Sequence, residues 1–358
     1  MKRHYIIPIF VPHYGCPHDC VFCNQKKITG LSTTVTPKDV DRIVSEHLAT
    51  FKEGATIEVA FFGGSFTAID IDIQRELLSV PVSYKKQAKI DQIRLSTRPD
   101  AINIEVLDML KENLVDTIEL GVQSMDDEVL YKSGRGHSSE DVYKASKLIK
   151  QYNINLGLQM MLGLPGDTRE KSINTCKEFI ALDPFCVRIY PTLVIKDTFL
   201  ESEYLDENYK PLDLSEAVDI SSLLLMLFTV NDIDVIRIGL QPTENIQMGK
   251  DVVAGPFHPA FRQLVESNIY IKLLKSYFLK EDMETKDKDL LIEANNALVS
   301  SISGQKSSNR KFLMKNYKFN KIKILGSHMD TNKINIKIED YSDCIDIKDE
   351  ISHYLNLI

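Results

Sequence analysis

Three cysteines near the N-terminus have the residue type and spacing to bind a metal. Cys16, Cys20 and Cys23 form a C-x3-C-x2-C pattern. Three thiolates on one short loop can ligate three irons of a 4Fe-4S cluster and leave the fourth iron open for chemistry. The same thiolates could instead hold a structural zinc ion, with His13 or His18 as the fourth, closing ligand. Spacing alone leaves both interpretations open.

The rest of the composition is that of an ordinary soluble protein. The 358 residues are 43% hydrophobic and 26% charged, with a net charge of −8, and no apolar run reaches the roughly 20 residues of a membrane span. The N-terminal apolar stretch leads into the cysteine cluster and not into a cleavage site, so we expect a cytoplasmic protein. In that compartment clustered thiols usually bind metal, whereas the scattered Cys176, Cys186 and Cys344 are expected to be structural thiols.

The elements that position the cysteines are predicted by an alternation of short apolar runs with longer segments of helical spacing. Between residue 6 and about residue 240 the apolar runs are IIPIFV, IEVAFF, IRLSTR, TIELGVQS, LGLQMMLGLP, VRIYPTLV and VIRIGLQ. Apolar strands alternating with helices indicate repeated βα units and a buried parallel sheet. The predicted fold is therefore α/β, a partial or complete (β/α) barrel of about six parallel strands over residues 1–238.

Unusual residues follow or occupy the carboxyl ends of these predicted strands. Active-site residues of such barrels gather at that end of the sheet. In strand order they are Cys16, Gly63-Gly64-Ser65, Ser96, Gln123, Gln159 and Tyr190. The glycine pair also suits a tight strand-to-loop turn, and the polar side chains also suit hydrogen bonds that close the barrel rim.

Two shorter regions follow the predicted barrel. Residues 239–285 are expected to cover the barrel mouth, and there His258 either contacts substrate or simply belongs to a turn. Residues 286–358 are expected to form a small basic α+β extension. Residues 281–293 carry six acids and two lysines, whereas residues 306–323 carry seven Lys or Arg and no acid.

The basic segment suggests a nucleic-acid partner. Residues 296–325 predict a helix, a polar turn with Gly304, a basic amphipathic helix and a strand. That order resembles a small module that clamps a nucleic-acid backbone through a G-x-x-G loop, although Ser307 stands where the second glycine would be. The sequence therefore predicts tRNA or other RNA binding through residues 296–325. Alternatively, the lysines balance the acidic residues 281–293.

The cysteine motif and the glycine loop together resemble those of radical S-adenosylmethionine (SAM) enzymes. In that family the three cysteines bind a 4Fe-4S cluster and the open iron chelates SAM. The resemblance implies that Phe22 lies beside the adenine and that the backbone of Gly63-Gly64 takes the methionine amino group. Ser65 replaces the usual acidic residue of this loop, which leaves its contact to carbonyl groups.

A longer series of motifs resembles the radical domain of the Elongator catalytic subunit. These motifs are LSTRPD (95–100), IELGVQS (118–124), SGRGH (133–137), GLPG (163–166) and IYPTLVIKDT (189–198). With the similarity to oxygen-independent coproporphyrinogen oxidase, they imply that Ser96 and Gln123 face the ribose and methionine of SAM. Arg135 would pair with the SAM carboxylate, which suits a guanidinium fork. Gln159 would lie near the adenosyl group and Tyr190 would project from the sixth strand end, or, equally, both would pack in the core.

The resemblance implies a reaction as well as a fold. A one-electron reductant such as flavodoxin or ferredoxin would reduce the cluster, and reductive cleavage of SAM would give a 5′-deoxyadenosyl radical that abstracts hydrogen from a substrate. The sequence ends at Ile358 without room for the acetyltransferase domain of the Elongator subunit, so acetyl transfer is not expected. The substrate is expected to be RNA or a small metabolite. An iron-sulfur binding or sensing protein without catalysis is the alternative from another class.

Overall fold

A computed structural model describes the chain except residues 1–3, 12–19, 25–34, 53 and 241–245. The chain divides into two compact units. The first comprises Met1–Leu212 and Leu240–Phe257, and the second comprises Asp213–Gly239 and His258–Ile358. Each unit therefore contains segments that are far apart in the sequence.

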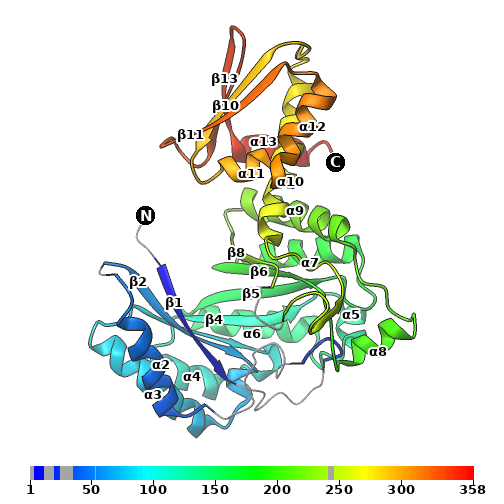
Figure 1. Ribbon diagram of the computed structural model, residues 1–358. Helices are drawn as coiled ribbons and strands as arrows, with labels where there is room; N and C mark the ends of the chain where they lie inside the picture. Colours follow the sequence, from blue (N-terminus) through cyan, green and yellow to red (C-terminus); the bar gives the residue numbers. More distant parts are fainter. Residues whose placement is uncertain (1–3, 12–19, 25–34, 53, 241–245) are drawn as a thin grey trace. The chain divides into compact units, whose positions relative to one another are not determined.

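The first unit contains a curved parallel sheet (Figure 1). Its strands follow one another across the sheet in chain order, as repeated βα units require. Those that belong to the first unit are β1 (His4–Val11), β2 (Thr56–Gly63), β3 (Gln92–Thr97), β4 (Thr117–Gln123), β5 (Asn155–Leu162) and β6 (Cys186–Pro191). Because β1 lies at an edge of the sheet, the barrel is partial. The predicted parallel barrel is confirmed, in its open form.

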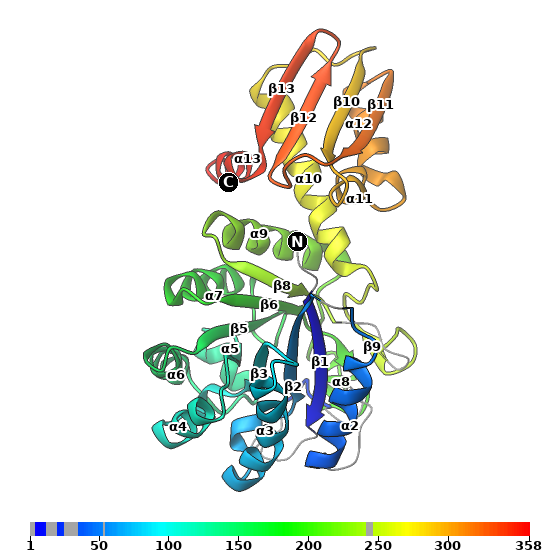
Figure 2. The ribbon, with the colours of Figure 1, turned by 90° about the vertical axis from the view of Figure 1, so that its left-hand side faces the viewer.

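Helices connect these strands and cover the outer face of the sheet (Figures 1 and 2). Most begin at a residue whose side chain accepts a hydrogen bond from a first-turn N–H. The helices are α2 (Pro37–Leu48), η1 (Phe66–Ala68), α3 (Ile71–Lys86), η2 (Pro99–Ala101), α4 (Ile104–Glu112), α5 (Asp127–Lys132), α6 (Ser139–Gln151), α7 (Arg169–Leu182) and α8 (Phe199–Leu205). A short antiparallel pair, β7 (Val194–Ile195) and β9 (Val252–Ala254), completes the unit.

The two faces of the parallel sheet differ in exposure. On β6, Val187 and Ile189 are fully buried, whereas Arg188 and Tyr190 between and after them are half-buried. On β5, Gln159 and Met161 are half-buried in the same way. Alternate strand residues point to opposite faces, so the inner face carries the half-buried polar side chains. This inner face is the lumen of the partial barrel.

The second unit contains a four-stranded mixed sheet with helices on it. Its elements are α9 (Leu214–Val230), β8 (Asp234–Ile238), α10 (Phe261–Lys280), β10 (Asp289–Asn295), α11 (Val299–Ser303), η3 (Gln305–Ser307), α12 (Ser308–Tyr317), β11 (Lys321–Ser327), β12 (Lys333–Ile338), β13 (Tyr341–Asp346) and α13 (Ile347–Leu355). The sheet order is β11-β10-β12-β13, in which β10 and β11 are parallel and the other pairs antiparallel. The small α+β extension is confirmed, and so is the predicted order of helix, turn, helix and strand over residues 296–325.

An apolar core joins α10 to this sheet. Tyr277, Ile292 and Ile336 are fully buried in it, and Phe278 packs against the rings of Tyr317 and Phe319. The alternation of buried and exposed residues along β10 and β12 reflects one face packed against helices.

His258 has both ring nitrogens bonded within the second unit. Nδ1 accepts from the Ala260 N–H at 3.0 Å, and Nε2 lies 3.2 Å from the side-chain amide of Gln305. These contacts match the role of a turn residue. None of the described helices is both long and apolar enough to cross a membrane.

Candidate active site

The described part of the cysteine loop is anchored by backbone hydrogen bonds. Cys20 is buried and Cys23 is half-buried. The Val21 N–H donates to the Ser133 carbonyl at 3.1 Å, and the Val21 carbonyl accepts from the Leu200 N–H at 2.8 Å. Cys16, His13 and His18 lie outside the described residues. Within the described ranges no three His, Cys, Asp or Glu side chains are grouped closely enough to hold a metal, so the three-cysteine ligand set stays a prediction.

Arg135 connects the cysteine loop to the end of β4. Its Nη1 donates to Cys20 Sγ at 3.1 Å, and its Nη2 donates to the Gly121 carbonyl. Arg135 is buried, and its Nε has no hydrogen-bond partner among the described residues. A buried N–H without an acceptor is costly, so this atom indicates an acceptor that the described residues do not supply.

Gly121 makes room for these side chains at a bulge. The register between β4 and β5 shifts between Gly121 and Gln123, and Gln123 has a left-handed backbone with φ of 74°. A Cβ at residue 121 would lie 3.1 Å from Gln123 Nε2 and 3.5 Å from Arg135 Nη2. The Gln159 amide donates to Gln123 Oε1 at 3.2 Å. The structure therefore brings together Cys20, Gln123, Arg135 and Gln159.

The glycine loop folds back onto the end of β1. Gly63 has a φ of 110°, and a Cβ there would lie 2.7 Å from the Val11 carbonyl oxygen. The Gly64 N–H donates to the same carbonyl at 3.0 Å. Only glycine accommodates this close approach. Because Val11 precedes the cysteine loop in the sequence, the two motifs lie at neighbouring strand ends.

Ser65 takes part in a buried hydroxyl network. Its Oγ lies 2.8 Å from Thr97 Oγ1 and accepts from the Arg98 N–H at 3.2 Å. The Arg98 guanidinium donates in turn to the Arg135 carbonyl. Ser65 is therefore linked to Arg135 through Arg98, and its hydroxyl is occupied by the rim of the sheet. This arrangement is consistent with a cofactor contact through the backbone of the glycine loop.

Three predicted residues lie apart from this group. Phe22 packs against the apolar cluster of Val194, Leu200, Tyr209 and Ala254. Ser96 is half-buried on β3, opposite Glu119 of β4. Tyr190 accepts a hydrogen bond from Arg188 Nη1 at 3.3 Å in the lumen.

The lumen also contains a buried charge ladder that the sequence reasoning missed. We use this name for Glu58, Arg94, Glu119 and Arg188, from β2, β3, β4 and β6. Arg94 Nε lies 2.8 Å from Glu58 Oε1, and Arg94 Nη1 lies 2.5 Å from Glu119 Oε1. Arg188 Nε lies 2.6 Å from Glu119 Oε2. The signal was the presence of a charged residue in the apolar runs IEVAFF, IRLSTR, TIELGVQS and VRIYPTLV.

Electrostatic attraction keeps the ladder charged. Burial disfavours the cation of Arg94, but attraction by Glu119 and Glu58 outweighs it and raises the pKa of Arg94. The pKa of Arg188 is also raised, because attraction by Glu119 outweighs burial. The Arg188 guanidinium also lies 5.0 Å from the centre of the Phe62 ring. Two acids and two arginines make the ladder neutral as a whole, as buried charges require.

His137 follows Arg135 in the SGRGH motif and is kept neutral. Burial, with Arg135 and Arg98 nearby, lowers the pKa of His137 to about 3. Its Nε2 lies 3.2 Å from the Val122 carbonyl, which identifies Nε2 as the protonated nitrogen of the neutral ring.

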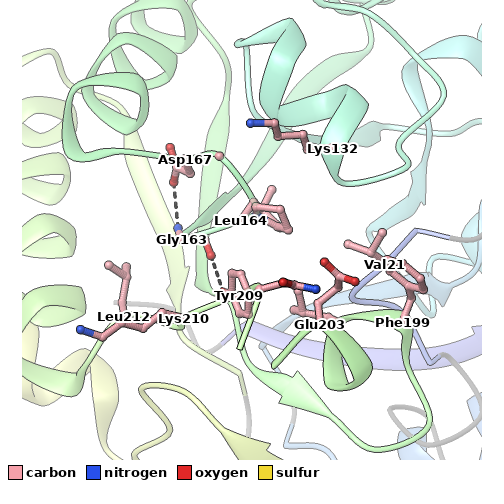
Figure 3. Close-up of a pocket in the computed structure, with 14 residues that line it drawn as sticks. Val21, Lys132, Gly163, Leu164, Asp167, Phe199, Glu203, Tyr209, Lys210 and Leu212 are labelled. Atoms are coloured by element: carbon pink, nitrogen blue, oxygen red, sulfur yellow. Dashed lines mark hydrogen bonds between the residues drawn. The ribbon is translucent and has the colours of Figure 1, made fainter. Parts of the chain in front are cut away.

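A cavity of about 510 Å³ lies beside the cysteine loop (Figure 3). Val21 lines it together with the GLPG loop and the segment after α8. The Gly163 N–H donates to Asp167 at 2.8 Å, and the Tyr209 hydroxyl donates to the Gly163 carbonyl at 2.5 Å. Burial raises the pKa of Asp167. None of the described residues predicted to contact cofactor lines this cavity.

Comparison with known proteins identifies the family. Residues 10–179 match the radical SAM superfamily profile, and residues 184–270 match the radical SAM C-terminal domain. The solved structure of the archaeal Elp3 of Methanocaldococcus infernus, with an N-terminal deletion, shares the fold with a TM-score of 0.57 at 19% identity. The match covers 98% of this chain and 76% of that one.

Curated relatives match over part of their length. An uncharacterized protein of Methanocaldococcus jannaschii is 29% identical over 58% of this chain and 66% of its own length. The tRNA uridine(34) acetyltransferase of M. infernus is 32% identical over 46% of this chain and 35% of its own length. The chain thus spans between about a third and two thirds of these relatives. The two profile matches cover the cysteine loop, the glycine loop and every strand end described above, and on that ground the chain belongs to the radical SAM superfamily.

Proposed function

We propose that this protein is a radical SAM enzyme in which Cys16, Cys20 and Cys23 hold a 4Fe-4S cluster. When bound, the cluster and SAM together supply a 5′-deoxyadenosyl radical that abstracts hydrogen from a substrate. The observation that carries the proposal is the position of Arg135, 115 residues after Cys20 in the sequence and 3.1 Å from its sulfur. A guanidinium at that distance complements the negative charge of a thiolate ligand.

The described residues fit the cofactor that the family uses. The unpartnered Nε of Arg135 is a donor suited to the carboxylate of SAM. Gln123 and Gln159 add amide groups at the same strand ends, and the glycine loop brings backbone close to the cysteine loop. Phe22 and Ser96 remain proposed contacts for the adenine and the ribose. The apolar cluster packed against Phe22 suits a stacking role for this residue, because it holds the Phe22 ring in place.

The residues of the lumen have roles that follow from their burial. The charge ladder places two acids and two arginines in the lumen, where they pair with one another. Tyr190 and Gln159 lie at the half-exposed positions above it and are proposed to face substrate. A one-electron reductant such as flavodoxin or ferredoxin is the proposed partner of the cluster.

RNA is the substrate class that we favour. Two curated matches, those of M. infernus and of Dehalococcoides mccartyi, are named tRNA uridine(34) acetyltransferases. A small metabolite is the second candidate, and the polar side chains in the lumen suit it.

The experiment is an assay of SAM cleavage. The protein is reconstituted without oxygen and reduced, and release of 5′-deoxyadenosine is measured. Cys20→Ala and Cys23→Ala should lose the cluster and all release, whereas Cys344→Ala, at an exposed thiol in the second unit, should keep both. A protein that binds the cluster but releases no 5′-deoxyadenosine would be an iron-sulfur binding or sensing protein. A full cluster in Cys20→Ala would contradict the ligand assignment.

A further inference from the structure

The four-stranded sheet of the second unit separates charge between its two edges. Residues 306–323, which lead into edge strand β11 and include its first three residues, carry seven Lys or Arg and no acid. Residues 339–350, which contain the opposite edge strand β13, carry six acids and one lysine. Figure 2 shows β11 and β13 at opposite edges of this sheet. We call the first segment the basic edge.

The cations of the basic edge are exposed and are not neutralised by the protein. All seven are exposed, and none makes an ion pair with an acid in the part of the chain that the structure describes. The nearby acids have other partners, since Glu281 pairs with Lys280 and Glu284 with Lys288. These two acids therefore pair outside the basic edge. The seven residues are Lys306, Arg310, Lys311, Lys315, Lys318, Lys321 and Lys323.

The basic edge is built on a rigid frame. This frame runs from β10 through α11, the turn at Gly304, and α12 into β11. Strand β11 pairs in parallel with β10. A Cβ at Gly304 would lie 2.4 Å from Ser308 Oγ, and the backbone there has a φ of 77°. The buried Asn309 amide donates to the Ser267 carbonyl at 2.8 Å. The turn is thus held against α10, with the Lys306 side chain directed to solvent.

The positions of the cations form two rows. Lys311 and Lys315 are four residues apart on α12, and Lys321 and Lys323 are two residues apart on β11. These separations correspond to roughly 6 Å along a helix and roughly 7 Å along a strand, with each pair on one face. Leu325 is 47% exposed beside them. Rows of cations with an exposed apolar side chain suit a strand of phosphates with unstacked bases.

We propose that the basic edge binds a single-stranded segment of RNA through its phosphates. The proposal deepens the proposed function, on which it rests only for the link between RNA binding and catalysis. An anionic membrane is a less suitable ligand, because the apolar side of α12 is already used. Leu313 is 1% exposed, and Phe312 packs against the core. A helix that lies on a bilayer needs that face free for insertion.

The test measures binding of a fluorescein-labelled oligouridine to the full chain by anisotropy at several salt concentrations. The variant Lys311→Ala/Lys315→Ala/Lys323→Ala should weaken binding by about tenfold or more at low salt. Its slope of log affinity against log salt should fall by about 2, since each phosphate contact on a single strand contributes about 0.7. The loss should be similar for oligoadenosine, because phosphate contacts do not read sequence.

The matched control is Lys286→Ala/Lys333→Ala/Lys337→Ala. These three lysines are exposed in the same unit, and their replacement removes as much charge as the basic-edge variant does. They lie outside the basic edge. Equal losses in the two triple variants, or an unchanged salt slope, would overturn the proposal. The proposal would also be overturned if the unchanged protein and the control variant bind phosphatidylserine vesicles, the basic-edge variant does not, and all three bind oligouridine equally well.

SAM cleavage is measured in the same preparations. Because the three basic-edge lysines lie outside the cysteine and glycine loops, 5′-deoxyadenosine release without RNA should be unaffected in the variant. If the protein releases 5′-deoxyadenosine but the basic-edge variant binds RNA as tightly as the unchanged chain, RNA binding by the basic edge is rejected and the proposed reaction is not. RNA binding that the variant weakens, in a protein that releases no 5′-deoxyadenosine, supports the basic edge and rejects the proposed reaction.

Discussion

Replacing Glu119 with glutamine should test whether the charge ladder stabilises the first unit. Glu119 is 3% exposed and accepts from Arg94 Nη1 at 2.5 Å and from Arg188 Nη2 at 3.0 Å, and Arg188 Nε lies 2.6 Å from its Oε2. Glutamine keeps the volume but removes the charge that two buried guanidinium groups share. Loss of one partner from a buried ionic group costs about 3–5 kcal/mol. That is a large part of the 5–15 kcal/mol by which typical domains are stable.

The assay is urea unfolding followed by far-ultraviolet circular dichroism. For an m-value of about 3 kcal/mol/M, the transition midpoint should fall by about 1 M or more. Glu112→Gln is the control, because Glu112 is 67% exposed where it pairs with Arg75. Such a surface change should stay within about 0.5 kcal/mol. A second change, Arg188→Gln, restores neutrality in the Glu119→Gln protein, so the double variant should lose less than the sum of the two single losses.

Two results would refute this reasoning. The first is a Glu119→Gln midpoint no lower than that of Glu112→Gln, which would mean that the arginines find other partners or water. The second is simple additivity of Glu119→Gln and Arg188→Gln, which would mean that the two side chains are not coupled.

Three further changes test other parts of the structure. Arg135→Ala should weaken SAM binding by about tenfold or more while the iron content is retained, since hydrogen bonds to charged groups contribute about 1.5–3 kcal/mol, and an unchanged dissociation constant would leave the guanidinium a structural role only. His137 has a folded pKa of about 3 and an unfolded one near 6.5, so the unfolded chain binds more protons between these values and the free energy of unfolding should fall, by up to about 1.4 kcal/mol per unit, as pH drops through that window; His137→Asn should flatten the profile, and a parallel profile would count against the buried neutral ring. Ser307 has a left-handed backbone with φ of 59°, so Ser307→Gly should raise the free energy of unfolding by up to about 1 kcal/mol. Ser308→Gly, at a right-handed position with φ of −59°, should lower the free energy of unfolding. Equal changes in the two variants would contradict the assigned backbone.

The sequence was sufficient to predict the partial barrel and the secondary structure of the extension. Apolar runs such as IEVAFF must be buried, and their alternation with capped helices leaves few arrangements other than parallel strands in chain order. For the extension, Gly304 between two helical segments marked the turn that the structure has.

The candidate site was only partly predictable, because side-chain partners depend on the folded geometry. The sequence places Arg135 in a polar loop, but its contact with Cys20 crosses 115 residues and requires the bulge at Gly121. Glu119 is a single acid within an apolar run, and only the register of four strands places it between two arginines. Cys16 and the zinc alternative with His13 or His18 stay predictions, since these residues lie outside the described ranges.

The opposite charges on the two edges of the four-stranded sheet make the second unit an electric dipole. A dipole near a polyanion experiences a torque as well as an attraction, and the torque turns the β11 edge toward the polymer and the β13 edge away from it. Molecules that arrive in the wrong orientation are thus rotated during the encounter instead of having to dissociate and collide again. The acidic edge, which makes no contact with the polymer, would in this way raise the association rate, and the effect should fade once the Debye length, about 10 Å at 0.1 M salt, becomes shorter than the width of the sheet.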